Sequence, residues 1–330
     1  MAIGIGRRQF ISALGTTALA WPIVARGQQP MPMIGFFRTG TADSNARYVA
    51  AFRKGLNETG FVEGQNVTVE YHWLEGHYDL QAQMADLIQR RVAVIATIGT
   101  SQVALAAKAA TTTIPIVFGE GEDPVRLGLV ASLARPGGNA TGINYFVDEV
   151  AAKRLRLLHD LVPKGVRVAV LVNPNNVTAT EFTLRAMEEA APTMGLQIQI
   201  LKATTINEID AAFATLARER PDALFVAPDA FFTSRRGQFA TLTARDKIPA
   251  AYAVRELVEA GGLMSYGTDI ADAFHQVGVY TGSILKGAKP AELPVVQPTK
   301  FEFVINLQTA RALGIDVPQG LLLIADEVIE

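Results

Sequence analysis

The chain has 330 residues and a formal net charge of −2, with 49% hydrophobic and 19% charged residues. This length suits two domains, and the composition indicates a globular rather than a disordered chain. The balanced charge gives no electrostatic indication of nucleic-acid binding. The chain contains no cysteine, which excludes disulfides, a thiol nucleophile, cysteine-ligated zinc and a lipid anchor attached through cysteine.

The first 27 residues have the order of features expected of an export signal. The pair Arg7-Arg8 precedes an apolar run over 12–24, and small residues at Ala25 and Gly27 suit a signal peptidase. The run is too short for a comfortable membrane span. We therefore predict a twin-arginine-type signal peptide cleaved near Gly27, export to the bacterial periplasm and no stable membrane insertion. A disordered basic tail or an uncleaved anchor is the alternative.

The stretch from Val92 to Lys108 predicts a strand that runs into a helix. Its first six residues are apolar or β-branched without alternation, which is typical of a strand buried on both faces. Gly99 then allows a turn, and the hydroxyls of Thr100 and Ser101 suit a helix N-cap. Such a turn places N–H groups and hydroxyls at the carboxyl edge of a sheet, where they suit a carboxylate or a phosphate. An ordinary N-cap is the alternative.

Two stretches, 33–145 and 151–253, repeat one order of predicted elements. Each has a buried strand, a polar loop, a helix, an alternating strand, a second helix, a second buried strand and a second polar loop. In the first stretch we also expect a helix over 125–133. The repeat indicates two similar α/β domains, each a doubly wound parallel sheet flanked by helices.

The last part of the chain exceeds what this repeat requires. We expect strands at 261–267 and 300–306 and helices at 270–285 and 307–313. The extra elements suggest that the chain crosses back to the first domain and then returns. Interwoven crossings of this kind form a hinge between two lobes.

No catalytic or metal-binding pattern stands out. The four histidines have no metal-ligand spacing, and neither a Gly-x-Ser-x-Gly elbow nor a Walker-type phosphate loop occurs. The acidic run 120–123 could hold a divalent cation, but a solvated loop is the preferred interpretation. We therefore expect neither an enzyme nor a bound cofactor or metal.

Polar side chains instead recur just after the predicted strands, where doubly wound sheets bind ligands. Hydroxyls there suit a carboxylate, an aspartate suits an ammonium group, and aromatic rings would supply an apolar wall. The candidate ligand-binding residues are Thr39, Thr100, Ser101, Glu120, Asn173, Asn175, Asp229, Phe231, Tyr266 and Asp269.

Several segments together resemble one known family. They include 55–67 (GLNETGFVEGQNV), 98–100 (IGT), 114–118 (IPIVF), 123–125 (DPV), 138–142 (GNATG), 172–175 (VNPN), 265–269 (SYGTD), 284–287 (ILKG) and 325–327 (ADE). The chain is similar in these segments to the substrate-binding proteins of ABC transporters, in the group that includes the binding protein of the tryptophan/tyrosine importer. The resemblance covers nearly the whole chain after the export signal.

The resemblance implies a two-lobed type I periplasmic binding fold with a three-crossover hinge. Lobe 1 would comprise 32–142 plus about 266–290, and lobe 2 would comprise 143–265 plus about 291–330. The protein would be a monomer that closes on a small-molecule solute and delivers it to a permease and an ATPase made as separate chains. An exported hydrolase-type enzyme and a sensory binding protein coupled to a receptor are the alternatives.

The resemblance also implies roles for individual residues. In the similar proteins that bind aromatic amino acids, the Gly-Thr turn receives the ligand carboxylate, which here means Thr100 with Ser101. The aspartate after Tyr-Gly meets the amine, which here means Asp269. Arg38 and Arg235 or Arg236 could instead meet a ligand with more negative charge.

Overall fold

The computed structural model describes Met1 and residues 31–330, apart from 75–78, 100 and 146–148. The predicted signal peptide and Thr100 therefore lie outside the described residues. By internal contacts the chain divides into Met1–Met31 and a second compact unit, Pro32–Glu330. The structure below is that of the second unit.

The first sheet of this unit has five parallel strands in the order β2-β1-β3-β4-β5. Strands β3 and β4 are buried at every residue, as their unbroken apolar runs predicted. The elements of this part are β1 Met33–Thr39, α1 Ala46–Glu58, β2 Thr68–Leu74, α2 Leu80–Gln89, β3 Val94–Ile98, α3 Ser101–Ala110, β4 Ile116–Glu120 and β5 Ala140–Asn144, with a 3-10 helix at Asp43–Asn45.

The second sheet has seven strands in the order β12-β11-β10-β9-β8-β6-β7. Among the described strands of this sheet, only β10 and β11 pair antiparallel, so β11 and β12 run opposite to the others. The remaining elements are α4 Glu149–Leu161, β6 Arg167–Val172, α5 Val177–Ala190, β7 Gln197–Lys202, α6 Ile206–Glu219, β8 Ala223–Val226, α7 Ala230–Ser234, α8 Arg236–Asp246, β9 Ala250–Tyr252, α9 Arg255–Glu259, β10 Met264–Thr268, α10 Ile270–Leu285, β11 Phe301–Asn306, α11 Leu307–Leu313, α12 Gln319–Ile324 and β12 Glu327–Ile329, with 3-10 helices at Pro192–Met194 and Pro290–Glu292.

Both sheets carry an apolar core on each face. In β1, Phe36 belongs to one buried cluster and Phe37 to another. In β6, Val170 and Leu171 separate in the same way. This alternation places helices on both faces, as a doubly wound fold requires, and the predicted α/β architecture with two sheets is confirmed.

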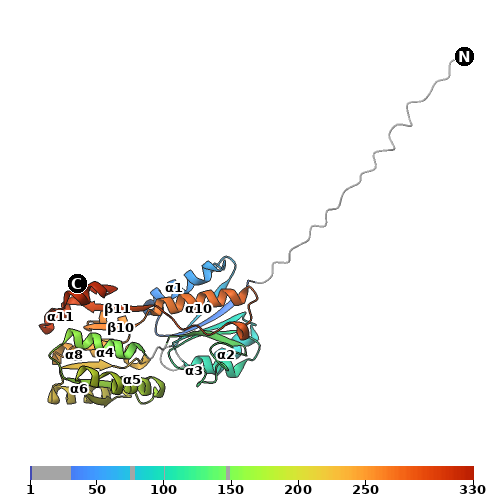
Figure 1. Cartoon of the computed structure of the whole chain (residues 1–330). Helices are drawn as coiled ribbons and strands as arrows, with labels where there is room; N and C mark the ends of the chain where they lie inside the picture. Colours follow the sequence, from blue (N-terminus) through green and yellow to red (C-terminus); the bar gives the residue numbers. More distant parts are fainter. Residues whose placement is uncertain (2–30, 75–78, 100, 146–148) are drawn as a thin grey trace. The chain divides into compact units, whose positions relative to one another are not determined.

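Helix α10 follows a strand of the second sheet but packs against the first. It contacts α1, β3, β4 and β5, and Figure 1 shows α1 and α10 side by side. After α10 the chain returns to the second sheet through β11. The chain therefore passes between the two sheets three times: between β5 and α4, between β10 and α10, and between Val296 and β11.

These passages are tied to one another near the cavity described below. The hydroxyl of Thr268 donates to the carbonyl of Tyr145 at 2.9 Å, and the amide of Asp269 donates to the carbonyl of Lys300 at 3.1 Å. Neighbouring segments of different passages are thus joined by hydrogen bonds.

The predicted helix over 125–133 is wrong. The segment forms successive turns, in which the amides of Leu129 and Val130 both donate to the carbonyl of Pro124. Gly128 has φ +74°, a left-handed conformation that interrupts helical hydrogen bonding. Leu129 and Val130 are buried in a core cluster of the first sheet, with Leu127 and Leu133 packed against it, whereas Val125 is exposed. The apolar spacing of this segment therefore reflects the packing of turns.

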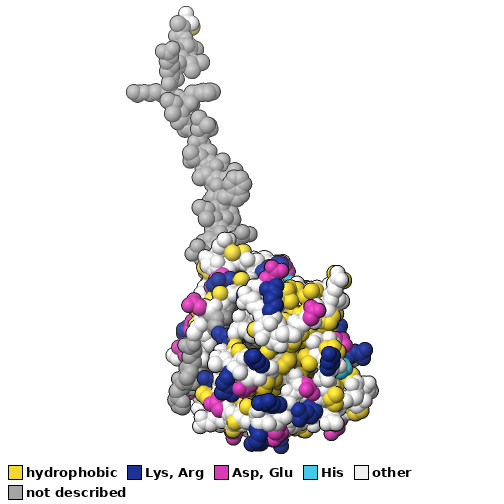
Figure 2. Space-filling view, turned by 90° about the vertical axis from the view of Figure 1, so that its left-hand side faces the viewer, with side chains coloured by type: hydrophobic (Ala, Val, Ile, Leu, Met, Phe, Trp, Pro, Cys, Tyr) yellow, Lys and Arg dark blue, Asp and Glu magenta, His cyan; other side chains and the backbone are white. Residues whose placement is uncertain are grey.

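The surface carries both signs of charge. On the face drawn in Figure 2, Lys and Arg side chains are interspersed with Asp and Glu, and hydrophobic side chains lie between them. Among the described residues, no helix is both long and apolar enough to cross a membrane.

Candidate functional site

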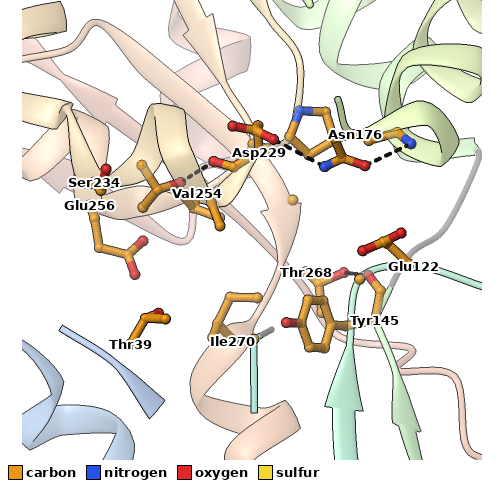
Figure 3. A pocket seen from close by; sticks show the side chains of 18 of the residues that line it. Thr39, Glu122, Tyr145, Asn176, Asp229, Ser234, Val254, Glu256, Thr268 and Ile270 are labelled. Carbon is orange, nitrogen blue, oxygen red and sulfur yellow. Dashed lines mark hydrogen bonds between the residues drawn. The ribbon is translucent and has the colours of Figure 1, made fainter. Parts of the chain in front are cut away.

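A cavity of about 850 Å³ lies where strand ends of both sheets converge. From the first sheet, Thr39 ends β1 and Glu120 ends β4; from the second, Asn173 follows β6 and Thr268 ends β10. In Figure 3, Asn176, Asp229 and Glu256 lie on one side of the cavity, and Thr39, Tyr145 and Ile270 on the other.

Six of the ten candidate residues line this cavity. They are Thr39, Ser101, Glu120, Asn173, Asn175 and Asp229. Thr100 lies outside the described residues. The remaining candidates, Phe231, Tyr266 and Asp269, are not among the lining residues.

These three side chains make other contacts. The carboxylate of Asp269 caps α10 by accepting from the amide of Asp272 at 3.1 Å. Tyr266 is buried in the core of the second sheet, where its ring stacks on that of Phe301. Phe231 packs against the other core cluster of that sheet. The structure therefore does not bring them into the cavity.

Glu120 is the buried acid on the first-sheet side, with an exposed fraction of 2%. Its Oε1 has no hydrogen-bond partner among the described residues. Burial, reinforced by the nearby charge of Glu122, raises the pKa of Glu120 well above its usual range, and Arg38 only partly offsets this. The sequence-based interpretation of a solvated acidic loop is wrong at Glu120, because β4 continues through this residue and keeps it inside.

The neighbours of Glu120 are fixed by hydrogen bonds. The amide of Asn144 donates to the carbonyls of Glu120 and Glu122, at 3.2 and 2.7 Å. The hydroxyl of Ser101 donates to the carboxylate of Glu122. The Ser101 hydroxyl proposed for a ligand carboxylate is therefore occupied by a carboxylate of the chain itself.

The second-sheet side is built from helix caps. Asn176 caps α5 by accepting from the amide of Ala179, and Asp229 caps α7 by accepting from that of Phe232. The amide of Asn176 also donates to Asp229 at 3.1 Å, so each cap orients the other, as Figure 3 shows. Sequence reasoning missed Asn176, although an asparagine directly before a helix is an N-cap signal.

Arg154 of α4 also lines the cavity and was missed. Its exposed fraction is 3%, and burial lowers its pKa to about 9, so the guanidinium remains charged at neutral pH. Arg154 lies four residues before the buried Leu158 in α4, so both side chains are on the inward face of the helix. A charged residue on an apolar face was the available signal.

Tyr48 and Glu256 form a link that sequence reasoning also missed. The hydroxyl of Tyr48 in α1 donates to Oε1 of Glu256 in α9, and both residues line the cavity. Burial raises the pKa of Tyr48, with Glu256 as a second cause. Because Tyr48 belongs to a core cluster of the first sheet and α9 contacts strands of the second, this bond joins the two sides.

Within the described part of the chain, no group of three His, Cys, Asp or Glu side chains is placed to hold a metal ion. The cavity chemistry there consists of carboxyl groups, guanidinium groups, amides and hydroxyls. Such groups bind a small polar or charged solute.

Comparison with known proteins identifies the family. The sequence profile described as "ABC transporter substrate binding protein" matches residues 40–329. The tyrosine-binding protein of Clostridioides difficile (strain R20291) is 26% identical over 263 residues, covering 79% of this chain and 75% of that protein.

Two solved structures support the same assignment. One is an ABC domain in complex with L-Trp from Streptococcus pneumoniae, with 25% identity, a TM-score of 0.80, and coverage of 90% of this chain and 99% of that chain. The other is the ligand-free, open structure of a substrate-binding protein with adhesive properties from Clostridium difficile, with 25% identity, a TM-score of 0.70, and coverage of 91% and 99%. The predicted two-lobed type I periplasmic binding fold is confirmed. The chain therefore belongs to the ABC transporter substrate-binding protein family.

Proposed function

We propose that this substrate-binding protein captures a small carboxylated solute, either an amino acid or an aromatic acid, in the cavity between its two sheets. The solute would then pass to a permease and an ATPase made as separate chains. The observation that carries this proposal is the cavity itself. Its volume of about 850 Å³ lies in the range of small-molecule sites, and strand ends of both sheets contribute polar groups to it.

Capture would occur by hinge closure. We propose lobes of 32–142 plus about 266–290 and of 143–265 plus about 291–330, joined by the three passages of the chain. A solute held between the lobes contacts both of them only when they close. It therefore favours the closed state by its difference in affinity for the two states.

We further propose that residues 1–27 are a twin-arginine-type signal peptide and that the protein acts as a monomer in the periplasm. The solute classes to test first follow from the relatives. One is called a tyrosine-binding protein, and another was solved with L-Trp.

The test is a thermal-shift screen of the full chain against amino acids, aromatic acids, dicarboxylates and short peptides. A solute that binds only the folded state raises the melting temperature in a concentration-dependent manner. At a hundred times its dissociation constant it adds ~2.7 kcal/mol to the free energy of unfolding. If no solute of any class shifts the melting temperature, solute capture is contradicted.

A matched pair of variants shows whether a solute that binds does so in the cavity. Ala230 lines the cavity and is exposed, so Ala230→Trp places a large ring there without disturbing the core. Ala214 is exposed on α6 and does not line the cavity, so Ala214→Trp is the control. We expect only Ala230→Trp to reduce the shift. An equal shift in both variants would place the solute elsewhere.

A further inference from the structure

We propose that Arg154 binds the carboxylate of the solute and is the anion-binding residue of the cavity. The inference rests on the proposed function, because it names the group through which a carboxylated solute would be held. It assigns the carboxylate to α4 on the second-sheet side rather than to the turn after β3.

The guanidinium of Arg154 is buried without a countercharge. Its one hydrogen bond to the described residues runs from Nε to the carbonyl of Tyr266, at 2.6 Å. Nη1 is buried and has no partner there. Although five carboxylates line the same cavity, none of those described forms an ion pair with Arg154. Arg154 thus lines the cavity without a charged partner among the described residues.

An unpaired buried charge is costly, and a carboxylate entering the cavity would remove that cost. A guanidinium is planar, and its free N–H groups match the two oxygens of a carboxylate. The bond to Tyr266 holds Nε on the β10 side, and the ring of Phe225 lies 5.1 Å from the guanidinium carbon. The side chain is therefore oriented before a ligand arrives, which reduces the entropy lost on binding.

The other two arginines that line the cavity are less suited to this role. Arg38 donates from Nε to Asn45 at 3.0 Å and from Nη1 to the carbonyl of Ile98 at 3.2 Å, so two of its five N–H groups already have partners. Arg236 is exposed, and water and salt screen its charge. Arg154 alone among the three is both buried and left with an unpartnered nitrogen in the described structure.

The experiment compares binding by calorimetry in the wild-type full chain and four variants. The carboxylate probes are L-tyrosine, L-tryptophan and 3-phenylpropionate, and tyramine is the matched probe that lacks the carboxylate. Arg154→Met keeps the length and bulk of the side chain without its charge, and Arg154→Lys keeps the charge without the planar guanidinium. Arg38→Met tests another arginine that lines the cavity, and Arg311→Met, at an exposed position of α11 outside the cavity lining, is the control.

For every carboxylate that binds the wild type, we expect Arg154→Met to weaken binding by about 30-fold or more. Arg154→Lys should be intermediate, and Arg311→Met should stay within about threefold. The ligand-free Arg154→Met protein should melt no lower than the wild type, because an apolar side chain replaces an unpaired buried charge. A purely structural Arg154, needed only to brace the carbonyl of Tyr266, would instead give a lower melting temperature.

Three outcomes would overturn the inference. Arg154→Met could retain wild-type affinity for a carboxylate, Arg38→Met could lose that affinity instead, or the wild type could bind tyramine as tightly as L-tyrosine. If the screen finds only solutes without a carboxylate, the Arg154 assignment fails while solute capture stands.

If no solute binds at all, solute capture fails and Arg154 is tested separately. The wild type and Arg154→Met are then melted in sodium acetate and in sodium chloride of equal ionic strength. Acetate should stabilise only the wild type, and equal melting of the wild type in both salts would overturn the assignment.

Discussion

The first and second sheets meet the cavity with similar strand ends, but the buried ionisable group on one side is an acid and that on the other side is a base. The first sheet contributes Glu120 and the second side contributes Arg154, each almost fully buried. Neither is in an ion pair with a described residue, and each leaves one buried polar atom unpartnered. Neither half thus supplies an ion-pair partner for its buried ionisable group among the described residues, which is typical of groups kept for a ligand.

The two halves of the protein, each consisting of one sheet and the helices that pack on it, also differ in how they are assembled. The second sheet draws its strands from the continuous stretch that begins at residue 167, whereas the first sheet depends on the distant helix α10 for part of its cover. Where α10 crosses α1, Gly55 and Gly278 bring the helix backbones together. A Cβ on Gly55 would lie 2.0 Å from the carbonyl oxygen of His275, and one on Gly278 would lie 2.2 Å from that of Phe52.

A substitution that separates α1 and α10 at this crossing should have the largest effect on the stability of the protein. Gly278→Ala would force the two helices apart and lower the free energy of unfolding by about 3 kcal/mol, the upper part of the range for overpacked cores. Urea unfolding measures the change. Because α10 covers the first sheet, we expect the first half to lose more protection from amide hydrogen exchange than the second.

The control is a helical glycine with open space around it. A Cβ on Gly237 in α8 would have no neighbouring atom from another part of the chain within 4 Å, so Gly237→Ala should stabilise the protein by about 0.5–1 kcal/mol through helix propensity. Wild-type stability of Gly278→Ala would show that the helices can separate at the α1–α10 crossing without loss of packing.

The buried carboxyl group of Glu120 should make the stability of the folded protein depend on pH, which tests the difference between the two halves. The pKa of Glu120 is raised above its usual 4.5 in the folded protein. The folded state therefore holds this proton more tightly than the unfolded state does. The contribution of Glu120 to stability is complete below pH 4.5 and is lost as pH rises through the folded-state value.

Glu120→Gln removes this titration. Relative to the wild type, the variant should gain up to about 1.4 kcal/mol of stability for each pH unit above about 4.5, until the folded-state pKa is passed. Urea unfolding at a series of pH values measures the difference. Glu188→Gln, at an exposed position, should follow the wild-type curve. Parallel curves for Glu120→Gln and the wild type would mean that Glu120 is not desolvated.

The sequence predicted the fold more completely than the site, and the reason is physical. Apolar runs such as Val94–Ile98 specify buried strands locally, and polar residues that follow parallel strands must share one edge. The position of six cavity residues follows from that rule alone. The segment 125–133 misled because buried turns can have the same apolar spacing as a helix.

Asp229 and Asp269 show the limit of local patterns. Both follow a strand and cap a helix, yet only Asp229 lines the large cavity. Which carboxylate reaches the cavity depends on how α7 and α10 are placed, and tertiary packing decides that. Arg154 was missed for the same reason, because whether an arginine is paired can be seen only when its neighbours from β8 and β10 are in position.

The smallest effect on stability is expected from an exposed ion pair between the two halves. Arg126, after β4, forms an ion pair of 3.0 Å with Glu181 of α5, and the two side chains are 52% and 50% exposed. Water screens such a pair, so a double-mutant cycle of Arg126→Met and Glu181→Gln should give a coupling of only about 0.5 kcal/mol, smaller still in high salt. A coupling above about 1.5 kcal/mol that persists in high salt would show that this contact, and not only the three chain passages with the Tyr48–Glu256 bond, holds the two halves together. In that case the resistance to opening would lie at the surface, and solute binding would have to act against it.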